Sequence, residues 1–395
     1  MVAEQVKNLS GEIFERVVAF RREMHQNPEL SFEEFETQKR IRKFLLDIGI
    51  TDVKDCANTG LIALIKGKNP DKKTIGLRAD IDALPIKEEN QCEYKSSNEG
   101  VMHACGHDVH TSSMLGTAYI LNKLRDQFEG TVKVVFQPGE ERLPGGASIM
   151  IKEGVLQNPT VETMTGQHVM PFIDAGKVGF RKGLYMASAD EIYITIHGKG
   201  GHGDHPHMNV DPIAISAQVI TALQQVVSRQ AKPAMPTVVS IGKIVGLGST
   251  NIIPDKVEME GTLRTFNEEW RMEAHKRIIQ VATSVTEALG GQCEIEVRKG
   301  YPFLNNHEET TEQARQAAVE YLGEENVEDL DIWPAGEDFA YFSQEVDSCF
   351  YRLGIRNEEK GITSMLHTPT FDIDESALEV GAGLMAFIAL KQLNA

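Results

Sequence analysis

Strand-length apolar runs alternate with helical patterns at both ends of this chain. The first runs cover residues 61–65, 74–77 and 132–136, and Met114 and Ala118 recur at helical spacing between the last two. Strands interleaved with helices indicate an α/β sheet that is covered on both faces. The pattern returns after Gly300, with a helix expected near 312–322, a strand near 349–354 and a terminal helix near 377–390.

Two helices are predicted before the first strand. Apolar residues recur at helical spacing over residues 13–24, and the pattern ends before Pro28, because proline disfavours helical backbone in the preceding residue. Ser31 with Glu34 three residues later predicts a capping box for the second helix. Gly49 suits the C-terminal end of that helix.

The hydrophobic pattern changes after about Gly183. Isoleucines at 192, 194 and 196 alternate with Tyr193 and Thr195, as in a half-buried strand. Asp211 before Pro212 predicts a helix start, with an N-cap and then proline at the first helical position. Further strands are expected at 238–244, 256–263 and 293–297, and a helix at about 268–289. The order β-α-β-β-α-β is the split βαβ, or ferredoxin-like, arrangement.

A chain of 395 residues exceeds what one hydrophobic core usually serves, which makes two domains the natural expectation. We predict that residues 1–183 and 300–395 form one α/β domain with a mixed sheet. Residues 184–299 are predicted to form an inserted α+β domain.

Charge and cysteine content bear on the possible partners. A formal net charge of −18 disfavours nucleic acids and anionic membranes, because both are polyanions. The apolar run near 380–390 is too short to span a bilayer, and residues 1–17 lack the pattern of a secretory signal. Five scattered cysteines do not suggest a disulfide framework. We therefore expect a cytoplasmic protein without nucleic-acid or membrane partners.

The segment Met102–His110, MHACGHDVH, is the richest in reactive groups. Cys105 and His107 stand two residues apart before a predicted helix, a placement that lets a thiolate and an imidazole converge on one metal ion or a pair. A buried cysteine beside polar groups at a helix start explains the same residues without a metal. The segment alone leaves both interpretations open.

Two adjacent glutamates, Glu140 and Glu141, come directly after an expected strand. Open α/β sheets bind ligands beyond the carboxyl ends of their strands, so functional side chains are expected at this place. Adjacent carboxylates repel each other, and a cation relieves that repulsion. One glutamate can bind a metal while its neighbour takes a proton from water. For an isolated pair, two surface glutamates are the commoner explanation.

Two further histidines, His168 and His367, each lie near an apolar run. Each alone is more readily explained as a structural histidine than as a ligand. Together with Cys105, His107 and Glu141 they make a set of five possible ligands, drawn entirely from the predicted α/β domain. That common origin favours a shared metal site.

Six segments together resemble the aminoacylase and carboxypeptidase metallopeptidases, specifically the branch of hippurate hydrolases and plant hydrolases of indoleacetyl amino acids. They follow one another over nearly the whole chain as Arg78–Ile86, Met102–His110, Phe136–Glu141, Gly198–His207, Gly336–Phe342 and His367–Asp372. A series of motifs in this order is highly specific.

The resemblance implies a dinuclear metallopeptidase-like catalytic domain. Its two divalent cations, zinc or manganese in the first place and cobalt or nickel as alternatives, would be bound by Cys105, His107, Glu141, His168 and His367. The Cys105 thiolate would bridge the cations, and Glu140 would be the general base. Other branches of the family have a ligand histidine at the position of Arg78. Since arginine cannot ligate a cation, His107 is expected to substitute, with Asp80 supporting the ligands.

The resemblance also assigns roles within the inserted domain. His202, in the glycine-rich stretch 198–203, would stabilise an oxyanion, and the domain would mediate dimerisation so that this histidine reaches the partner's active site. The adjacent pair 204–205, Asp-His, departs from the small or apolar residues usual in the family. Asn251 and Arg264 would lie near the free carboxylate of the substrate, for which arginine offers a matching planar fork. Without the resemblance, these residues would be interpreted as ordinary loop and strand positions.

The expected function is hydrolysis of the amide bond of N-acyl amino acids, which releases a carboxylic acid and a free amino acid. Short peptides present the same groups, so dipeptidase or carboxypeptidase activity is the nearest alternative. A catalytically silent metal-binding scaffold is a third interpretation, because fold does not fix function. Loss of the base or of a ligand would mark such a scaffold, and all of these residues are present. The expected assembly is a homodimer or a higher homo-oligomer.

Overall fold

The computed structural model describes residues 2–394, which form two compact units. The larger unit comprises the chain up to Tyr185, Asn305–Ile332 and the chain from Asp338 onward. The inserted unit comprises Met186–Leu304 and Trp333–Glu337. Residues 333–337 were expected in the larger unit but belong to the inserted one. They join it because Trp333 forms a parallel bridge with Met186.

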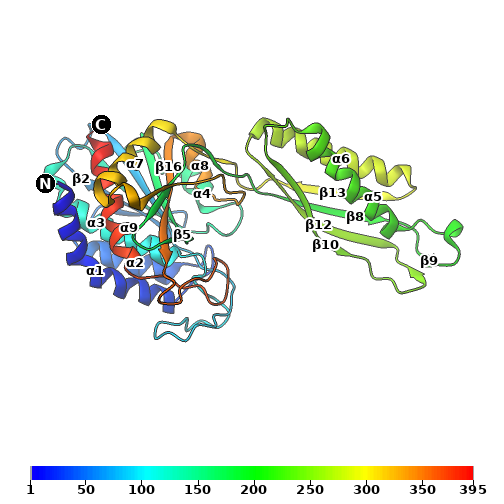
Figure 1. Ribbon diagram of the computed structural model, residues 1–395, viewed down its shortest axis with the longest axis horizontal. Helices are drawn as coiled ribbons and strands as arrows, with labels where there is room; N and C mark the ends of the chain where they lie inside the picture. The colour runs from blue at the N-terminus through cyan, green and yellow to red at the C-terminus, as the bar shows by residue number, and fades with distance from the viewer. Residues whose placement is uncertain (1, 395) are drawn as a thin grey trace. The chain divides into compact units, whose positions relative to one another are not determined.

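The larger unit is built on one mixed sheet of eight strands (Figure 1). In spatial order these are β1 (Val53–Cys56), β2 (Gly60–Lys66), β4 (Thr131–Gln137), β3 (Thr74–Asp80), β5 (Thr163–Asp174), β16 (Asp347–Arg356), β6 (Val178–Phe180) and β15 (Val327–Asp329). The central strands β4, β3, β5 and β16 are mutually parallel, whereas β2 and β6 pair with them antiparallel. Every residue of β3 and β4 is buried, as expected for strands covered on both faces. The predicted mixed α/β fold is confirmed.

Helices cover both faces of this sheet. On one face α3 (His107–Lys123) packs against α1 (Val2–Gln26) and α9 (Ala377–Leu393), and α7 (Glu308–Leu322) packs against α9. On the other face α4 (Gly146–Lys152) packs against α8 (Ala340–Glu345). Alternate residues of β16 mark the two faces: Tyr351 joins the large apolar core, whereas Phe350 stacks on Phe339 beside α8. Within residues 2–394 none of the helices combines the length and apolar character that crossing a membrane requires.

The second helix, α2 (Phe35–Asp47), lies where it was predicted but is not capped as predicted. The Ser31 hydroxyl donates to Asp82 at 2.6 Å, and Glu34 at the N-cap position makes no capping bond with its side chain. The predicted capping box is therefore wrong, because both side chains form hydrogen bonds with residues distant in the sequence instead. Gly49 has a φ of 84° and follows the end of the helix as expected.

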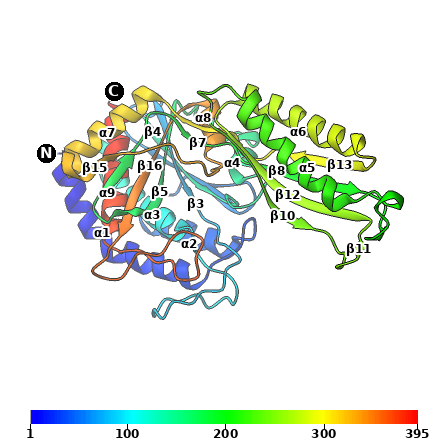
Figure 2. The ribbon, with the colours of Figure 1, turned by 45° about the vertical axis from the view of Figure 1, so that its right-hand side comes forward.

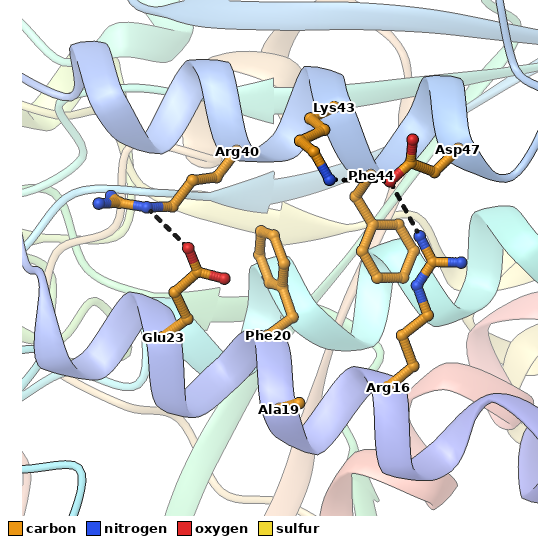
Figure 3. Close-up of a pocket in the computed structure, with 8 residues that line it drawn as sticks. All are labelled: Arg16, Ala19, Phe20, Glu23, Arg40, Lys43, Phe44 and Asp47. Atoms are coloured by element: carbon orange, nitrogen blue, oxygen red, sulfur yellow. Dashed lines mark hydrogen bonds and ion pairs between the residues drawn. The ribbon is translucent and has the colours of Figure 1, made fainter.

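A hollow of about 320 Å³ lies between α1 and α2 (Figure 3). The rings of Phe20 and Phe44 meet edge to face there, with centroids 5.4 Å apart. Two ion pairs cross it, Arg16 with Asp47 at 3.5 Å and Arg40 with Glu23 at 3.2 Å. These charges neutralise one another, so we assign the hollow to the packing of the two helices.

The inserted unit has a four-stranded antiparallel sheet with two helices on one face (Figure 2). Its strands in spatial order are β10 (Thr237–Val245), β12 (Lys256–Thr265), β8 (Asp190–His197) and β13 (Gln292–Arg298), and its helices are α5 (Pro212–Gln225) and α6 (Glu268–Ala288). This is the predicted split βαβ order. The Asp211 carboxylate accepts from the backbone N–H groups of Ile213 and Ala214, which confirms the predicted N-cap. A short ladder pairs β9 (Gly201–His202) with β11 (Ile252–Ile253).

Candidate metal centre

Part of the site lies where strands of the larger sheet end. β3 ends at Asp80 and β4 ends at Gln137. Glu140 and Glu141 follow β4 in a short loop, and His168 lies within the long strand β5. Because β3, β4 and β5 are parallel neighbours, the residues at their carboxyl ends lie at one edge of the sheet, where open α/β sheets bind ligands.

Two loop segments bring the remaining donors. Cys105 precedes α3, and His107 is the first residue of that helix. Gly106 between them has a φ of 83°, a left-handed backbone that glycine adopts without strain. His367 lies in the loop after β16 with a φ of 60°, and its N–H donates to the carbonyl of Ala104 at 2.8 Å. This contact ties the His367 loop to the segment that carries the cysteine.

The five predicted ligands come together as two donor groups that share one sulfur. Cys105, His107 and His168 form the first group and are all buried. Cys105, Glu141 and His367 form the second. The Cys105 Sγ lies 3.4 Å from His168 Nε2 and 3.3 Å from His367 Nε2, and His367 Nε2 lies 3.2 Å from Glu141 Oε1. The two donor groups thus lie side by side and have the Cys105 thiol in common.

Hydrogen bonds orient the two buried imidazoles. His168 Nδ1 donates to the carbonyl of Val169 at 2.8 Å, and His107 Nδ1 lies 3.2 Å from Asp82 Oδ1. In both residues the contact is made by Nδ1, so Nε2 is left on the side of Cys105. Protein partners of one ring nitrogen usually fix the tautomer of a metal-binding histidine in this way. Burial, joined by the positive charge of Arg352, holds the pKa of His168 well below its ordinary value. His168 is therefore neutral, the form that binds a cation.

Two orphaned atoms show that the donors fit a cation. His107 Nε2 and Glu141 Oε1 are buried, and within residues 2–394 neither makes a well-aligned hydrogen bond, although His367 Nε2 lies 3.2 Å from Glu141 Oε1. A buried polar atom without a partner typically costs about 1–3 kcal/mol, so such atoms call for an explanation. Burial and then the charges of Glu141 and Glu140 raise the pKa of Cys105 well above its usual value. A bound cation reverses that effect, because it stabilises the thiolate.

Glu140 lies beside the two donor groups that contain Cys105. Its Oε2 is 4.0 Å from His107 Nε2, and its Oε1 accepts a long bond of 3.4 Å from the backbone N–H of Asp338. Its side chain is nearly buried. A carboxylate in this position can accept a proton from water held at the centre.

Asp82 organises the centre, and the sequence analysis did not identify it. Besides its contact with His107, it accepts from the Ser31 hydroxyl at 2.6 Å and from the backbone N–H of Glu141 at 3.1 Å. Burial alone would raise the pKa of Asp82, but the hydrogen bonds from His107 and Ser31 bring it below its ordinary value. The carboxylate is therefore ionised. Its place in Arg78–Ile86, two residues beyond a buried strand, was a usable signal.

Glu34 positions the glutamate loop and was also missed. Its carboxylate accepts from the backbone N–H of Gly139 at 2.9 Å and from the Thr59 hydroxyl at 2.6 Å. Burial, with the nearby charge of Asp82, raises the pKa of Glu34 to about 7. Gly139 has a φ of 59°, and a Cβ there would lie 2.3 Å from the ring of Phe32. The loop therefore needs glycine immediately before Glu140.

The remaining predicted residues lie in the inserted unit. His202 is 53% exposed, and its Nδ1 accepts from the backbone N–H of Asp204 at 3.2 Å. The carbonyl of Asn251 accepts from the N–H of Gly203 at 2.8 Å, so Asn251 and His202 share one loop cluster. Arg264, in β12, donates through Nη1 to the hydroxyl of Thr262.

Buried sulfur, imidazole and carboxylate donors beside a spare carboxylate, at the edge of a mixed α/β sheet, are features of a metallopeptidase-like hydrolase. Residues 76–391 match the peptidase family M20/M25/M40, and this chain belongs to that family. It is a hydrolase, and the family resemblance indicated by its motifs is confirmed.

Three similar proteins illustrate the family. Thermostable carboxypeptidase 2 of Saccharolobus solfataricus is 38% identical over 100% of this chain and 99% of its own. An N-acyl-L-amino acid amidohydrolase of Geobacillus stearothermophilus is 41% identical over 78% of this chain and 83% of its own. The crystal structure of the Bacillus subtilis protein YXEP, described as a dinuclear metal-binding peptidase from the M20 family, superimposes with a TM-score of 0.83 at 37% identity, covering 97% of this chain and 99% of that one.

Proposed function

We propose that this chain hydrolyses the amide bond of N-acyl amino acids, using two divalent cations. The ligands would be Cys105, His107, Glu141, His168 and His367. The observation that carries the proposal is that one sulfur, Cys105 Sγ, belongs to two donor groups. Glu140 is in neither of these two groups, but it lies within reach of His107 and Glu141, one member of each. The names of the amidohydrolase from Geobacillus stearothermophilus and of the dinuclear Bacillus subtilis protein support it.

The donor types limit the choice of cation. A thiolate, imidazoles and a carboxylate together suit first-row transition metals better than magnesium or calcium. Zinc and manganese are our first proposals, and cobalt and nickel fit the same donors. The metal available in the cell would then decide among them.

Glu140 is the proposed general base. When bound, the two cations would act as Lewis acids that make water more acidic and polarise the amide carbonyl. Glu140 accepts the proton of the attacking water as the new C–O bond forms, and it returns that proton to the amine as the C–N bond breaks. The bond from Asp338 N–H to Oε1 leaves Oε2 on the side of His107.

Recognition of the substrate's carboxylate is assigned to Arg264 and Asn251. Within residues 2–394 Arg264 makes its hydrogen bonds through Nη1, which leaves Nη2 and Nε to receive an anion. Burial lowers the pKa of Arg264, so a bound carboxylate would stabilise its charge. His202 is proposed to stabilise the oxyanion that forms on the amide oxygen.

We further propose a homodimer that forms through the inserted unit. β10 is an edge strand of its sheet, and Ile244 near its end and Leu247 just beyond it are 51% and 89% exposed. Leu247 and Ile252 also line a hollow of about 530 Å³. Exposed edge strands and apolar patches favour pairing with another chain. A cytoplasmic, reducing compartment is proposed because all five cysteines are free thiols.

Peptidase activity is the second candidate. The relative from Saccharolobus solfataricus is named a carboxypeptidase and covers the whole chain. A short peptide offers the same amide beside a free carboxylate, so the proposed contacts of Arg264 would serve both substrates.

The test is release of amino acids from a panel of N-acetyl, N-benzoyl and indoleacetyl amino acids and of dipeptides. Protein stripped with a chelator and protein restored with each of the four metals are assayed in parallel, with Glu140→Gln as the inactive control. Metal-dependent cleavage of the acyl amino acids supports the proposal, and faster cleavage of dipeptides favours the peptidase. A restored protein that cleaves no member of the panel would make the silent scaffold the better interpretation.

A further inference from the structure

Arg78 lies at the centre of a buried polar network behind the metal centre. The residue is fully buried at the end of β3. Its guanidinium donates in three directions: Nη1 to Asp80 Oδ2 at 2.7 Å, Nη2 to Asp338 Oδ1 at 2.7 Å and Nε to Gln137 Oε1 at 2.9 Å. These partners come from the end of β3, the end of β4 and the segment before α8. One side chain therefore joins three elements.

One branch of the network leads to the proposed general base. The Asp338 carboxylate accepts from Gln137 Nε2 at 2.8 Å and from the backbone N–H of Ala147 at 3.0 Å, in addition to Arg78. The backbone N–H of Asp338 donates to Glu140 Oε1. Because its side chain is held by several donors, the Asp338 backbone can rotate little, and its N–H keeps its direction toward Glu140.

The other branch leads to a proposed ligand. Asp80 Oδ2 accepts from Arg78 and lies 3.7 Å from His107 Nε2. Asp80 Oδ1 is held by His110 Nδ1 at 2.5 Å. Both oxygens of Asp80 are thus held in place beside His107.

We propose that Arg78 is a positioning residue for the metal centre: its guanidinium sets the orientation of Glu140 through Asp338 and the surroundings of His107 through Asp80. This inference rests on the proposed function. A planar group with donors in fixed directions suits the task, and lysine cannot replace it, because an ammonium on a flexible stem cannot hold three separate acceptors in one plane. Residues that support metal ligands typically affect metal affinity or activity about 10- to 100-fold.

The test compares Arg78→Lys with the wild-type enzyme and with Lys133→Met. Lys133 is a matched control, because it is also a buried cation of the larger unit and donates to three acceptors, the carbonyls of Val155, Gln157 and Pro159. The readouts are metal affinity by competition with a chelator, the thiolate-to-cobalt absorption band of the cobalt-loaded protein, and kcat and KM separately. We expect Arg78→Lys to weaken metal affinity about 10- to 100-fold, shift the cobalt band and lower kcat more than KM. Lys133→Met should lose stability only.

Gln137→Met provides a milder second variant, since it removes one acceptor of Arg78 and one donor to Asp338. If Arg78→Lys does not fold, Gln137→Met tests the role of Arg78 in its place. We expect smaller changes in metal affinity, cobalt band and kcat, in the same directions. Folded variants with wild-type affinity, cobalt band and kcat would overturn the role of Arg78. A wild-type protein that binds fewer than two cations would instead overturn the proposed function, and this inference with it.

Discussion

Val169 donates its backbone N–H to Nε2 of His110 at 2.9 Å, and this contact decides what the histidine can do. An imidazole nitrogen that accepts a hydrogen bond has no free lone pair for a cation. Nδ1 must then carry the proton, which it donates to Asp80. Burial lowers the pKa of His110, in agreement with a neutral ring. His110 lies close enough to Asp80 and His107 to suggest a third donor group, yet its hydrogen bonds exclude it as a ligand.

His110→Gln should therefore keep two bound cations. The variant loses at least one buried hydrogen bond, so we expect it to be less stable by about 1–3 kcal/mol. His168 is a proposed ligand whose ring lies next to that of His110, with centroids 4.5 Å apart. His168→Gln should therefore bind fewer cations. Metal content measured by atomic emission after gel filtration separates the two. Equal loss of metal from both variants would show that His110 is a ligand.

The adjacent glutamates should differ sharply when each is changed to glutamine. Glu140→Gln removes the proton acceptor and should lower kcat by about 10²- to 10⁴-fold while both cations remain bound. Glu141→Gln removes a ligand and should lower metal content as well as activity. Metal analysis and kcat are measured on the same preparations. Full activity of Glu140→Gln would refute the assigned mechanism.

Sequence patterns predicted the main helices and strands of the inserted unit and, in the larger unit, β2, β3, β4 and β16 with α1, α2, α3, α7 and α9, because strands and helices impose periods of two and 3.6 residues on neighbouring positions. They did not predict β1, β5, β6, β15, α4 or α8. They also predicted the five donors that the structure gathers. The contacts that support the donors could not be predicted from sequence patterns, because their partners are distant along the chain. Arg78 and Asp338, for example, are 260 residues apart. Ser31 illustrates the reverse error, because its spacing to Glu34 matched a local capping motif while its real partner is Asp82.

Asp190 should make the stability of the inserted unit fall at acid pH. Its carboxylate is fully buried and accepts from Arg271 Nε at 2.8 Å, His275 Nε2 at 2.7 Å and the backbone N–H of Gly300 at 3.0 Å. Burial would raise the pKa of Asp190, but these partners lower it to about 2. Because the folded pKa lies below the unfolded one, the stabilisation is present above about pH 4 and is lost as the pH falls through about 2.

Asp190→Asn should destabilise the inserted unit by about 3–5 kcal/mol at pH 7, since it leaves Arg271 buried without its charge partner. The difference from wild type should shrink between pH 4 and pH 2. Both tryptophans, Trp270 and Trp333, belong to this unit, so tryptophan fluorescence during urea unfolding reports on it alone. A difference that stays constant down to pH 2 would contradict the assigned pKa.

His202 provides the sharpest test of the proposed dimer. If it stabilises the oxyanion in the partner's active site, His202→Ala should lose about 10²- to 10³-fold in kcat and keep its cations. Each active site would then combine Glu140 of one subunit with His202 of the other. Mixing inactive Glu140→Gln protein with inactive His202→Ala protein, under conditions that exchange subunits, should create mixed dimers with one intact site of the two. Activity that reappears on mixing supports a shared site. If exchange is verified by mass-tagged subunits and no activity returns, His202 must act within its own chain or not at all.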